Sequence, residues 1–341
     1  MPPNPQLLDR DRARATSALV LADVLPNLTE IVDEGTNLLA RLNQTVWQGG
    51  EPRSLHTVLL LLLRHAVEQA DAVDELFRAG CYLPARLQAR SVVEAQMQML
   101  YMVGRRNPFH PSPLPQGVAD PHPKNAAGAP LSGQALADAL DLRAQVYLVA
   151  ELRRRIAAAQ ALELPAAQAD ARRRTGSPSV PTALADVNTQ AGIAGEIATM
   201  QAMLQQPDKA PANAALTAAR TGRFANFDPP WYALNGGPVS AAGLARSVGD
   251  VTAYELFYSE ASRTMHATDI EGQLVARRRG GGQVLAPLRE AEDLHHFLSV
   301  YITKIATAFE IAITEIRPSD RPQWQQWTQR WVAPLRSGEQ E

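Results

Sequence analysis

Apolar residues recur at intervals of three and four through several long stretches of this chain, and no other sequence feature constrains the fold as strongly. That interval matches the turn of an α-helix, so each stretch predicts an amphipathic helix. The most apolar stretch runs from Leu55 to Ala79, and its segment from Val58 to Leu63 is apolar on every side. A helix without a polar face belongs in a core, so we expect this segment at the centre of the molecule.

The predicted fold class is all-α, a multi-helix bundle with a Pro-rich insertion and at most one small β-hairpin. The helices that the pattern predicts span residues 19–42 (one long helix or a kinked pair), 55–79, 83–103, 132–164, 182–205, 212–220, 251–265 and 288–316, with a short helix capped by Ser240 before 251–265. The segment from Gln273 to Ala286 contains three consecutive glycines and predicts the hairpin. We expect one core, formed by the helices around residues 55–103, 250–266 and 288–316.

Proline density divides the chain into parts. Seven prolines lie between Gly104 and Gly133, a density that no regular element tolerates, so we expect an exposed, mobile insertion there. The predicted parts are N-terminal helices with the central core helices (1–103), a Pro- and Arg-rich insertion with accessory helices (104–230), C-terminal helices that complete the core (231–317) and a Trp-containing tail (318–341). The tryptophans of the tail lie at helical spacing and predict that it docks on the body or on a partner: Trp324, Trp327 and Trp331.

Charge and cysteine content limit the classes of function. The chain carries 33 Lys and Arg against 35 Asp and Glu, so it lacks the basic excess of a protein that binds nucleic acid with its whole surface. Any nucleic-acid site must therefore be local. Thirty of the 33 cations are arginine, which suits forked contacts with phosphate but which we attribute to a GC-rich bacterial genome.

The sequence favours a cytoplasmic protein without a membrane segment. The N-terminus is polar and lacks the apolar segment of a signal peptide. The longest uninterrupted apolar run, Val58 to Leu63, is far too short to span a bilayer. Cys81 is the only cysteine, which excludes an internal disulfide and a thiolate zinc cluster and fits a reducing compartment.

Two of the predicted core helices carry polar stripes. On the central helix the charged residues lie at steps of four, three and four, which places them on one face: Arg64, Glu68, Asp71 and Glu75. The next helix carries Arg90 and Glu94 one turn apart. Because charges inside a bundle persist when they are paired, we expect the two stripes to exchange ion pairs in an antiparallel packing.

A third polar stripe starts on the predicted helix 251–265. Its members follow one another at intervals of four residues: Tyr254, Tyr258, Ser262 and His266. A histidine can carry protons near neutral pH, a carboxylate can orient it, and an arginine can stabilise developing negative charge. We therefore predict His266, Arg90 and Glu94 as catalytic residues. The supporting polar cluster comprises Arg64, Glu68, Tyr254, Tyr258 and Ser262. The alternative is that the same residues form a structural network that fixes the register of the helices.

These residues also carry a resemblance to a known family. An Arg-Ser-x-x-Glu helix (Arg90, Ser91, Glu94) and a Tyr-x-x-x-Tyr-x-x-x-Ser-x-x-x-His helix (Tyr254 to His266) resemble the bacterial all-helical family of domain of unknown function 5677. The likeness leaves out the Pro- and Arg-rich middle of the chain. It implies the helical architecture and the choice of site residues rather than an activity.

More distantly, the chain is similar to helical nucleotide-binding and ribonuclease toxin domains of the higher-eukaryote-and-prokaryote type (HEPN). This similarity implies a role in bacterial antiphage defence or as a toxin. Those ribonucleases use an arginine, then four to six residues, then a histidine. At His266 the pattern fails, because Arg263 is only three positions upstream.

The resulting functional hypothesis is a bacterial defence or toxin-type protein that acts on RNA or a nucleotide, as a ribonuclease or a nucleotide-processing enzyme. The alternative is a non-catalytic helical scaffold or sensor, in which the Trp-rich tail binds a protein partner. A homo-oligomer fits either hypothesis.

No metal or cofactor is expected. His65 with Glu68, and Glu292 with His295, have the spacing of helical di-iron sites. Such a site needs two further bridging carboxylates, and the sequence assigns at most Glu94 to that role. The pairs therefore remain better explained as solvated helix faces.

Overall fold

The computed structural model describes residues 9–48, 50, 52–108, 114–163, 187–259, 274–276, 283–285 and 294–337. Within these residues the fold is all-α apart from one two-stranded hairpin, which confirms the predicted fold class. The chain divides into two compact units, of which the first comprises Met1–Ser132 with Ser240–Glu341 and the second comprises Gly133–Val239. The second unit thus begins and ends later in the chain than the predicted insertion at 104–230.

The first unit is built mainly from long helices. Its helical elements are α1 (Arg10–Val20), α2 (Leu25–Gln48), α3 (Ser54–Arg78), α4 (Tyr82–Met102), α9 (Ala241–Val248), α10 (Val251–Ala253), η4 (Tyr254–Ser259), α12 (Leu294–Ile316), η6 (Pro318–Asp320) and α13 (Arg321–Ser337). Strands β1 (Leu274–Ala276) and β2 (Gln283–Leu285) pair antiparallel, as the three glycines between them predicted.

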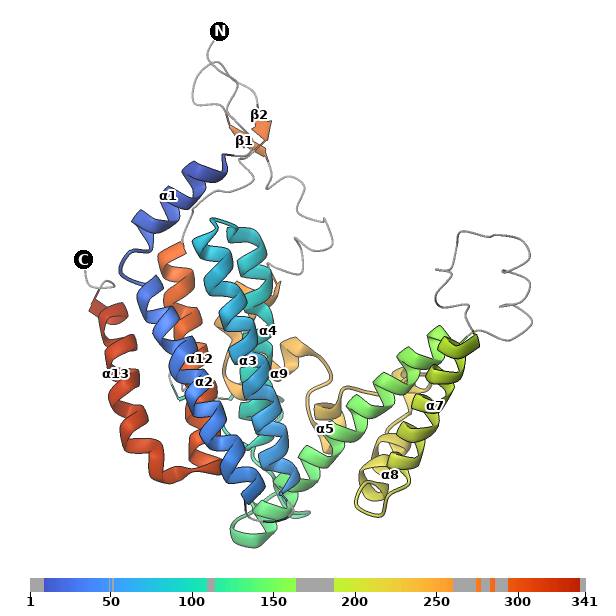
Figure 1. The fold of residues 1–341 in the computed structure, drawn as a ribbon. Coiled ribbons are helices and arrows are strands. Elements are labelled where there is room, and N and C mark those ends of the chain that lie inside the picture. Colours follow the sequence, from blue (N-terminus) through green and yellow to red (C-terminus); the bar gives the residue numbers. More distant parts are fainter. Residues whose placement is uncertain are drawn as a thin grey trace. The chain divides into compact units, whose positions relative to one another are not determined.

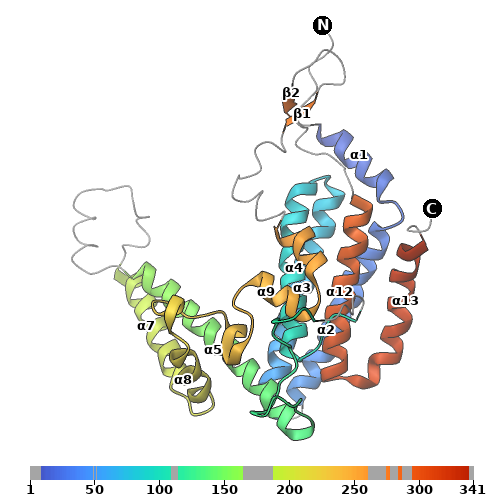
Figure 2. The ribbon, with the colours of Figure 1, turned by 180° about the vertical axis from the view of Figure 1, so that it is seen from behind.

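Helix α12 is central to the first unit. It packs against α2, α3, α4 and α13, and Figures 1 and 2 show these helices side by side. The predicted packing of the helices around residues 55–103 and 288–316 in one core is confirmed, and α2 joins that core. By length and composition α12 could cross a membrane, but 72% of its most apolar window is buried inside the protein. Its apolar composition is therefore what a core helix requires.

The ends of two helices follow local sequence signals. Gly80 ends α3 in the left-handed region at φ 67°, where a side chain would meet the backbone of Ala13 in α1. Ser240 caps α9, because its hydroxyl accepts a hydrogen bond of 3.1 Å from the backbone N–H of Gly243. The predicted cap at Ser240 is confirmed.

The Trp-containing tail forms α13 and docks on α12, as predicted. Trp324 and Trp331 are 1% and 0% exposed. The Trp324 ring meets Phe309 of α12 edge-on at a centroid distance of 5.1 Å, and Trp331 lies 5.4 Å from Trp324. These two rings therefore belong to the core of the first unit and offer no surface to a partner.

The Pro-rich stretch after α4 is exposed at residues 115–117 and 124–130, as its composition predicted, but other parts of it pack within the first unit. Residues 104–108 and 114–132 belong to the first unit, and Pro121 and Pro123 are buried. The backbone N–H of buried Asn107 donates to the Val248 carbonyl at 2.8 Å, and the Ser247 hydroxyl donates to the Ala119 carbonyl at 2.7 Å. Proline prevents regular structure, but extended chain can still pack when neighbouring helices supply hydrogen-bond partners.

The second unit contains α5 (Gly133–Leu162), α7 (Val187–Leu204), α8 (Ala210–Ala218), η2 (Gly222–Phe224) and η3 (Trp231–Gly236). Helix α5 is the central helix of this unit, because α7, α8 and η3 all pack against it. The buried Trp231 ring meets Tyr147 of α5 edge-on at a centroid distance of 5.5 Å. Trp231 thus lies inside this unit and not in the C-terminal part where the sequence predicted it.

Candidate functional site

Helix α4 carries Arg90 and Glu94 on a half-buried face. One turn further along, Gln98 Nε2 lies 3.5 Å from Glu94 Oε1. Helix α4 packs against η4, which carries the half-buried Tyr254. The structure therefore brings together the two elements on which Arg90, Glu94 and Tyr254 were predicted to form a site.

The rest of the third stripe is only partly within the described residues. Ser262 and His266 lie outside them, and of Tyr258 only the backbone, in η4, is described. The predicted catalytic role of His266 therefore stays a prediction. In the sequence, His266 follows the last residue of η4, Ser259, by seven positions.

The helix that carries Tyr254 is not the regular α-helix predicted for 251–265. The chain passes from α10 into a π-helix at Tyr254. A π-helix closes its hydrogen bonds over five residues instead of four, so side chains four apart no longer follow the α-helical stripe. Single π-helical turns are rare and frequently lie at functional sites, which makes the contact between η4 and α4 the candidate site of this chain.

The polar stripe on α3 lies at the surface. Its four members are exposed: Arg64, Glu68, Asp71 and Glu75. Arg64 lines a groove between α2 and α3, so it faces α2 rather than Arg90 and Glu94 on α4. Among the described residues, Arg64 and Glu68 have no ion-pair partner. The expected pairing of the two stripes is therefore not found, and the α3 stripe is a solvated helix face.

A buried ion pair lies beside the candidate site and was not predicted. The Lys304 ammonium of α12 donates to Asp250 Oδ1 at 2.5 Å, and the two side chains are 1% and 0% exposed. Asp250 directly precedes α10, so the pair connects α12 with the turn that leads into η4. The second oxygen, Asp250 Oδ2, has no hydrogen-bond partner in the part of the chain that the structure describes.

Two neutral polar side chains are buried in the same region. Tyr301 lies one turn before Lys304, and its ring packs against Phe257 of η4 at a centroid distance of 6.2 Å. Burial raises the pKa of Tyr301 well above its usual value, so the phenol stays neutral. Gln96 of α4 is fully buried. Neither the Tyr301 hydroxyl nor the Gln96 amide has a hydrogen-bond partner among the described residues.

Contacts at both ends fix the register of α4 against α12. They are Arg86 over the ring of Phe297, 5.3 Å from its centroid, and Arg105, three residues beyond the end of α4, with Glu315 at 2.6 Å. The two helices therefore run parallel. This register places Arg90 level with Tyr301, and Glu94 level with Lys304. The buried polar residues thus lie at the same height in the bundle as the predicted site.

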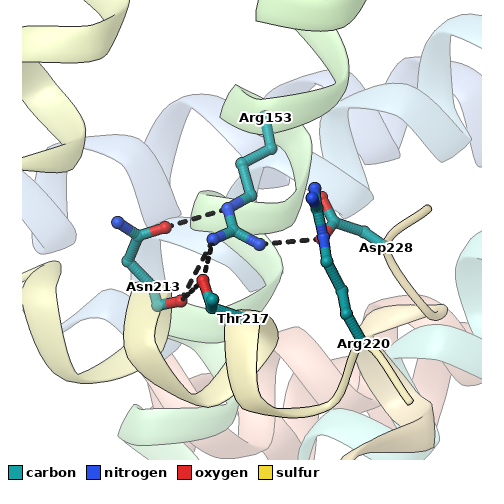
Figure 3. A network of polar contacts seen from close by, with 5 residues as sticks. All are labelled: Arg153, Asn213, Thr217, Arg220 and Asp228. Atoms are coloured by element: carbon teal, nitrogen blue, oxygen red, sulfur yellow. Dashed lines mark hydrogen bonds and ion pairs between the residues drawn. The ribbon is translucent and has the colours of Figure 1, made fainter. Parts of the chain in front are cut away.

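The second unit holds another polar cluster, centred on Arg153 (Figure 3). The guanidinium donates from Nε to Asn213 Oδ1 at 2.8 Å, from one terminal nitrogen to Asp228 Oδ1 at 2.7 Å, and from the other to the Thr217 hydroxyl. Arg220 also donates to Asp228 Oδ1, at 2.7 Å. Every nitrogen of Arg153 is engaged, so this cluster ties α5 to α8 rather than offering a site.

The charge of Asp228 supports that interpretation. Burial alone would raise the pKa of Asp228, but the hydrogen bond from Arg220 and the charge of Arg153 outweigh burial and lower it. The carboxylate is therefore ionised at neutral pH and stabilises the fold of the second unit. Arg153 therefore connects two helices, whereas its neighbours Arg154 and Arg155 are exposed.

Metal binding finds no support in the described residues, where no three His, Cys, Asp or Glu side chains could share an ion. His65 and Glu68 are both exposed. His295 Nε2 lies 3.3 Å from Asp23 Oδ2, and Glu292 lies outside the described residues.

Comparison with known proteins gave no match, whether to a family model, to a curated protein or to a solved structure. The resemblances drawn from Arg90, Glu94 and the stripe ending at His266 therefore remain predictions. The contact of α4 with η4 and the chemistry of the residues there are the basis for assigning a function.

Proposed function

We propose that this chain is a bacterial defence or toxin-type protein that acts on RNA or a nucleotide through Arg90, Glu94 and His266. One observation carries the proposal: helix α4, on which Arg90 and Glu94 are half-buried, packs against the π-helical η4. A π-helical turn at that contact favours a functional site over a regular structural packing. A cytoplasmic location is part of the proposal, because RNA and nucleotides are cytoplasmic substrates.

Each residue has a role that its chemistry supports. With RNA as substrate, His266 would take the proton of a ribose 2′-hydroxyl as its oxygen attacks the adjacent phosphorus, and would return a proton to the departing 5′-oxygen. Arg90 would hold the phosphate with its forked donors and stabilise the added charge. Glu94 would orient one or both of these groups. With a nucleotide as substrate, Arg90 would again hold a phosphate.

Induction of the wild-type protein in a bacterial host is expected to slow growth and to fragment RNA, and His266→Ala is expected to abolish both effects. Loss of the proton carrier typically costs 10²- to 10⁴-fold in rate, enough to remove toxicity. The measurements are growth curves and total RNA on a gel, at matched soluble levels of protein. His65→Ala, at an exposed position on α3, is the matched control and should behave as wild type.

Two results would count against the proposal. Equal toxicity of wild type and His266→Ala would remove His266 from the mechanism. Normal growth with intact RNA in every strain, together with unchanged nucleotide pools, would remove the toxin-type activity.

A helical scaffold or sensor is the second candidate function, and a specific observation favours it. The tryptophans Trp324 and Trp331 of the tail are buried in the first unit, so they cannot bind a partner. The exposed side chains of Trp47 and Leu61, which border the groove between α2 and α3, could contact one instead. In a scaffold, Arg90 and Glu94 would serve packing alone. Replacing either by Ala would then lower the free energy of unfolding by about 2 to 4 kcal/mol, because each would leave a buried partner unpaired.

A further inference from the structure

Helices α2 and α3 enclose a groove on the surface of the first unit, separate from the candidate site on α4. The groove has a volume of about 460 Å³. From α2 it is lined by a helical stripe of Thr36, Leu39, Ala40, Asn43 and Trp47, and from α3 by Thr57, Leu60, Leu61 and Arg64. Volumes of roughly 300 to 1,000 Å³ are typical of small-molecule sites.

The wall of the groove is mostly apolar, and part of that apolar surface is open to solvent. Leu60 forms its floor at 7% exposure, while Trp47 and Leu61 are 57% and 46% exposed. A tryptophan this exposed next to an open leucine leaves a contiguous apolar surface unburied. Filling the groove with an apolar group would remove that surface from water.

The polar groups of the groove are few, and two of them lack partners. The Thr36 hydroxyl donates to the Val32 carbonyl in α2, and the Thr57 hydroxyl donates to the carbonyl of Arg53, which precedes α3, so both are already engaged. The Arg64 guanidinium and the Asn43 amide have no hydrogen-bond or ion-pair partner within the described part of the chain. A single cation at the rim of an apolar groove is complementary to a ligand with one anionic group.

We propose that this groove binds a small amphipathic anion, with its carboxylate or a similar acid at Arg64 and its apolar body extending toward Leu61 and Trp47. The spacing of the two stripes places Arg64 at one end of the groove and Trp47 at the other. An acidic protein helix fits less well, because beyond Arg64 the same face of α3 carries Glu68 and Asp71, which would repel it. The charge pattern thus selects a short ligand with one acid group.

Decanoate and decanol test the proposal, because they share an apolar chain and differ in the acid group. Titration calorimetry on the full chain is expected to show saturable decanoate binding and weaker decanol binding. Arg64→Gln should lower the affinity for decanoate about fivefold, the effect of an exposed charge pair, and leave the affinity for decanol unchanged. Leu61→Asp should lower the affinity for both ligands. Arg154→Gln, an exposed arginine of α5, is the matched control and should bind as wild type.

Several outcomes would overturn the proposal. Absence of saturable decanoate binding to the wild type would do so, as would equal weakening by Arg64→Gln and Arg154→Gln. If light scattering shows that the wild type is a dimer and that Leu61→Asp is a monomer, a second copy of the chain occupies the groove instead. Circular dichroism melts of each variant ensure that a loss of binding is not a loss of fold.

Discussion

Replacing Lys304 by Met is expected to lower the free energy of unfolding by about 3 to 5 kcal/mol, the usual cost of breaking a buried ion pair from one side. Lys304 and Asp250 are 1% and 0% exposed, so the variant would leave the Asp250 carboxylate without its cation in the core. Asp250 Oδ2 already lacks a partner among the described residues, so no neighbouring group is in place to compensate. The measurement is urea unfolding followed by circular dichroism.

The chain offers a matched control and a rescue for this prediction. Lys124 and Asp120 form a Lys–Asp pair at 3.0 Å that is 43% and 31% exposed, so Lys124→Met should cost less than about 1 kcal/mol. Adding Asp250→Asn to Lys304→Met should recover part of the lost stability, because the stranded charge is removed. Equal effects of Lys304→Met and Lys124→Met would show that the buried pair does not stabilise the fold.

Trp331→Ala is expected to lower the free energy of unfolding by about 3 to 5 kcal/mol, because it leaves a cavity in a tightly packed aromatic cluster. Trp331 is 0% exposed and lies 5.4 Å from the Trp324 ring, which packs on Phe309 of α12. The matched control is Trp47→Ala, since Trp47 is 57% exposed and buries much less surface. Thermal unfolding of both variants checks the prediction. A similar loss for the two would mean that α13 does not stabilise the core.

Most helices of this chain could be predicted because they bury stripes of apolar side chains, but α1 (Arg10–Val20) was missed, since it buries only Ala13 and Ser17. The hairpin and the cap at Ser240 could also be predicted from the sequence, since glycine turns and serine caps depend only on residues that are close together in the chain. The docking of the tail followed from Trp324 and Trp331 at helical spacing. These features depend on local chemistry, which a single sequence contains.

Features that depend on contacts between distant segments were missed. The packing of Pro121 and Pro123 depends on neighbouring elements, and the π-helix at Tyr254 was missed as well. The sequence wrongly predicted that the α3 stripe with Arg64 pairs with charges on α4. Helical periodicity shows which residues share one face of a helix, but it does not show which neighbouring helix that face meets.

One missed feature did have a sequence signal. Lys304 is one of only three lysines in the chain, and it stands inside the apolar run YITKIATAF. A lone cation in an apolar helix predicts a buried partner, because an unpaired charge in a core is too costly to persist. The partner, Asp250, could not be assigned, since aspartate before a helix is a common capping residue.

The proposal that Arg90 on α4 holds the phosphate of a substrate is tested most directly by the rate at which purified protein consumes a labelled single-stranded RNA and ATP. It predicts that the wild type processes one of them. It also predicts that Arg90→Ala lowers that rate at least tenfold, while its melting temperature stays within about 2 °C of wild type. Arg154→Ala, on an exposed helix face, should change neither quantity. Failure of the wild type to act on either substrate, or full activity with lost stability in Arg90→Ala, would rule out this role for Arg90.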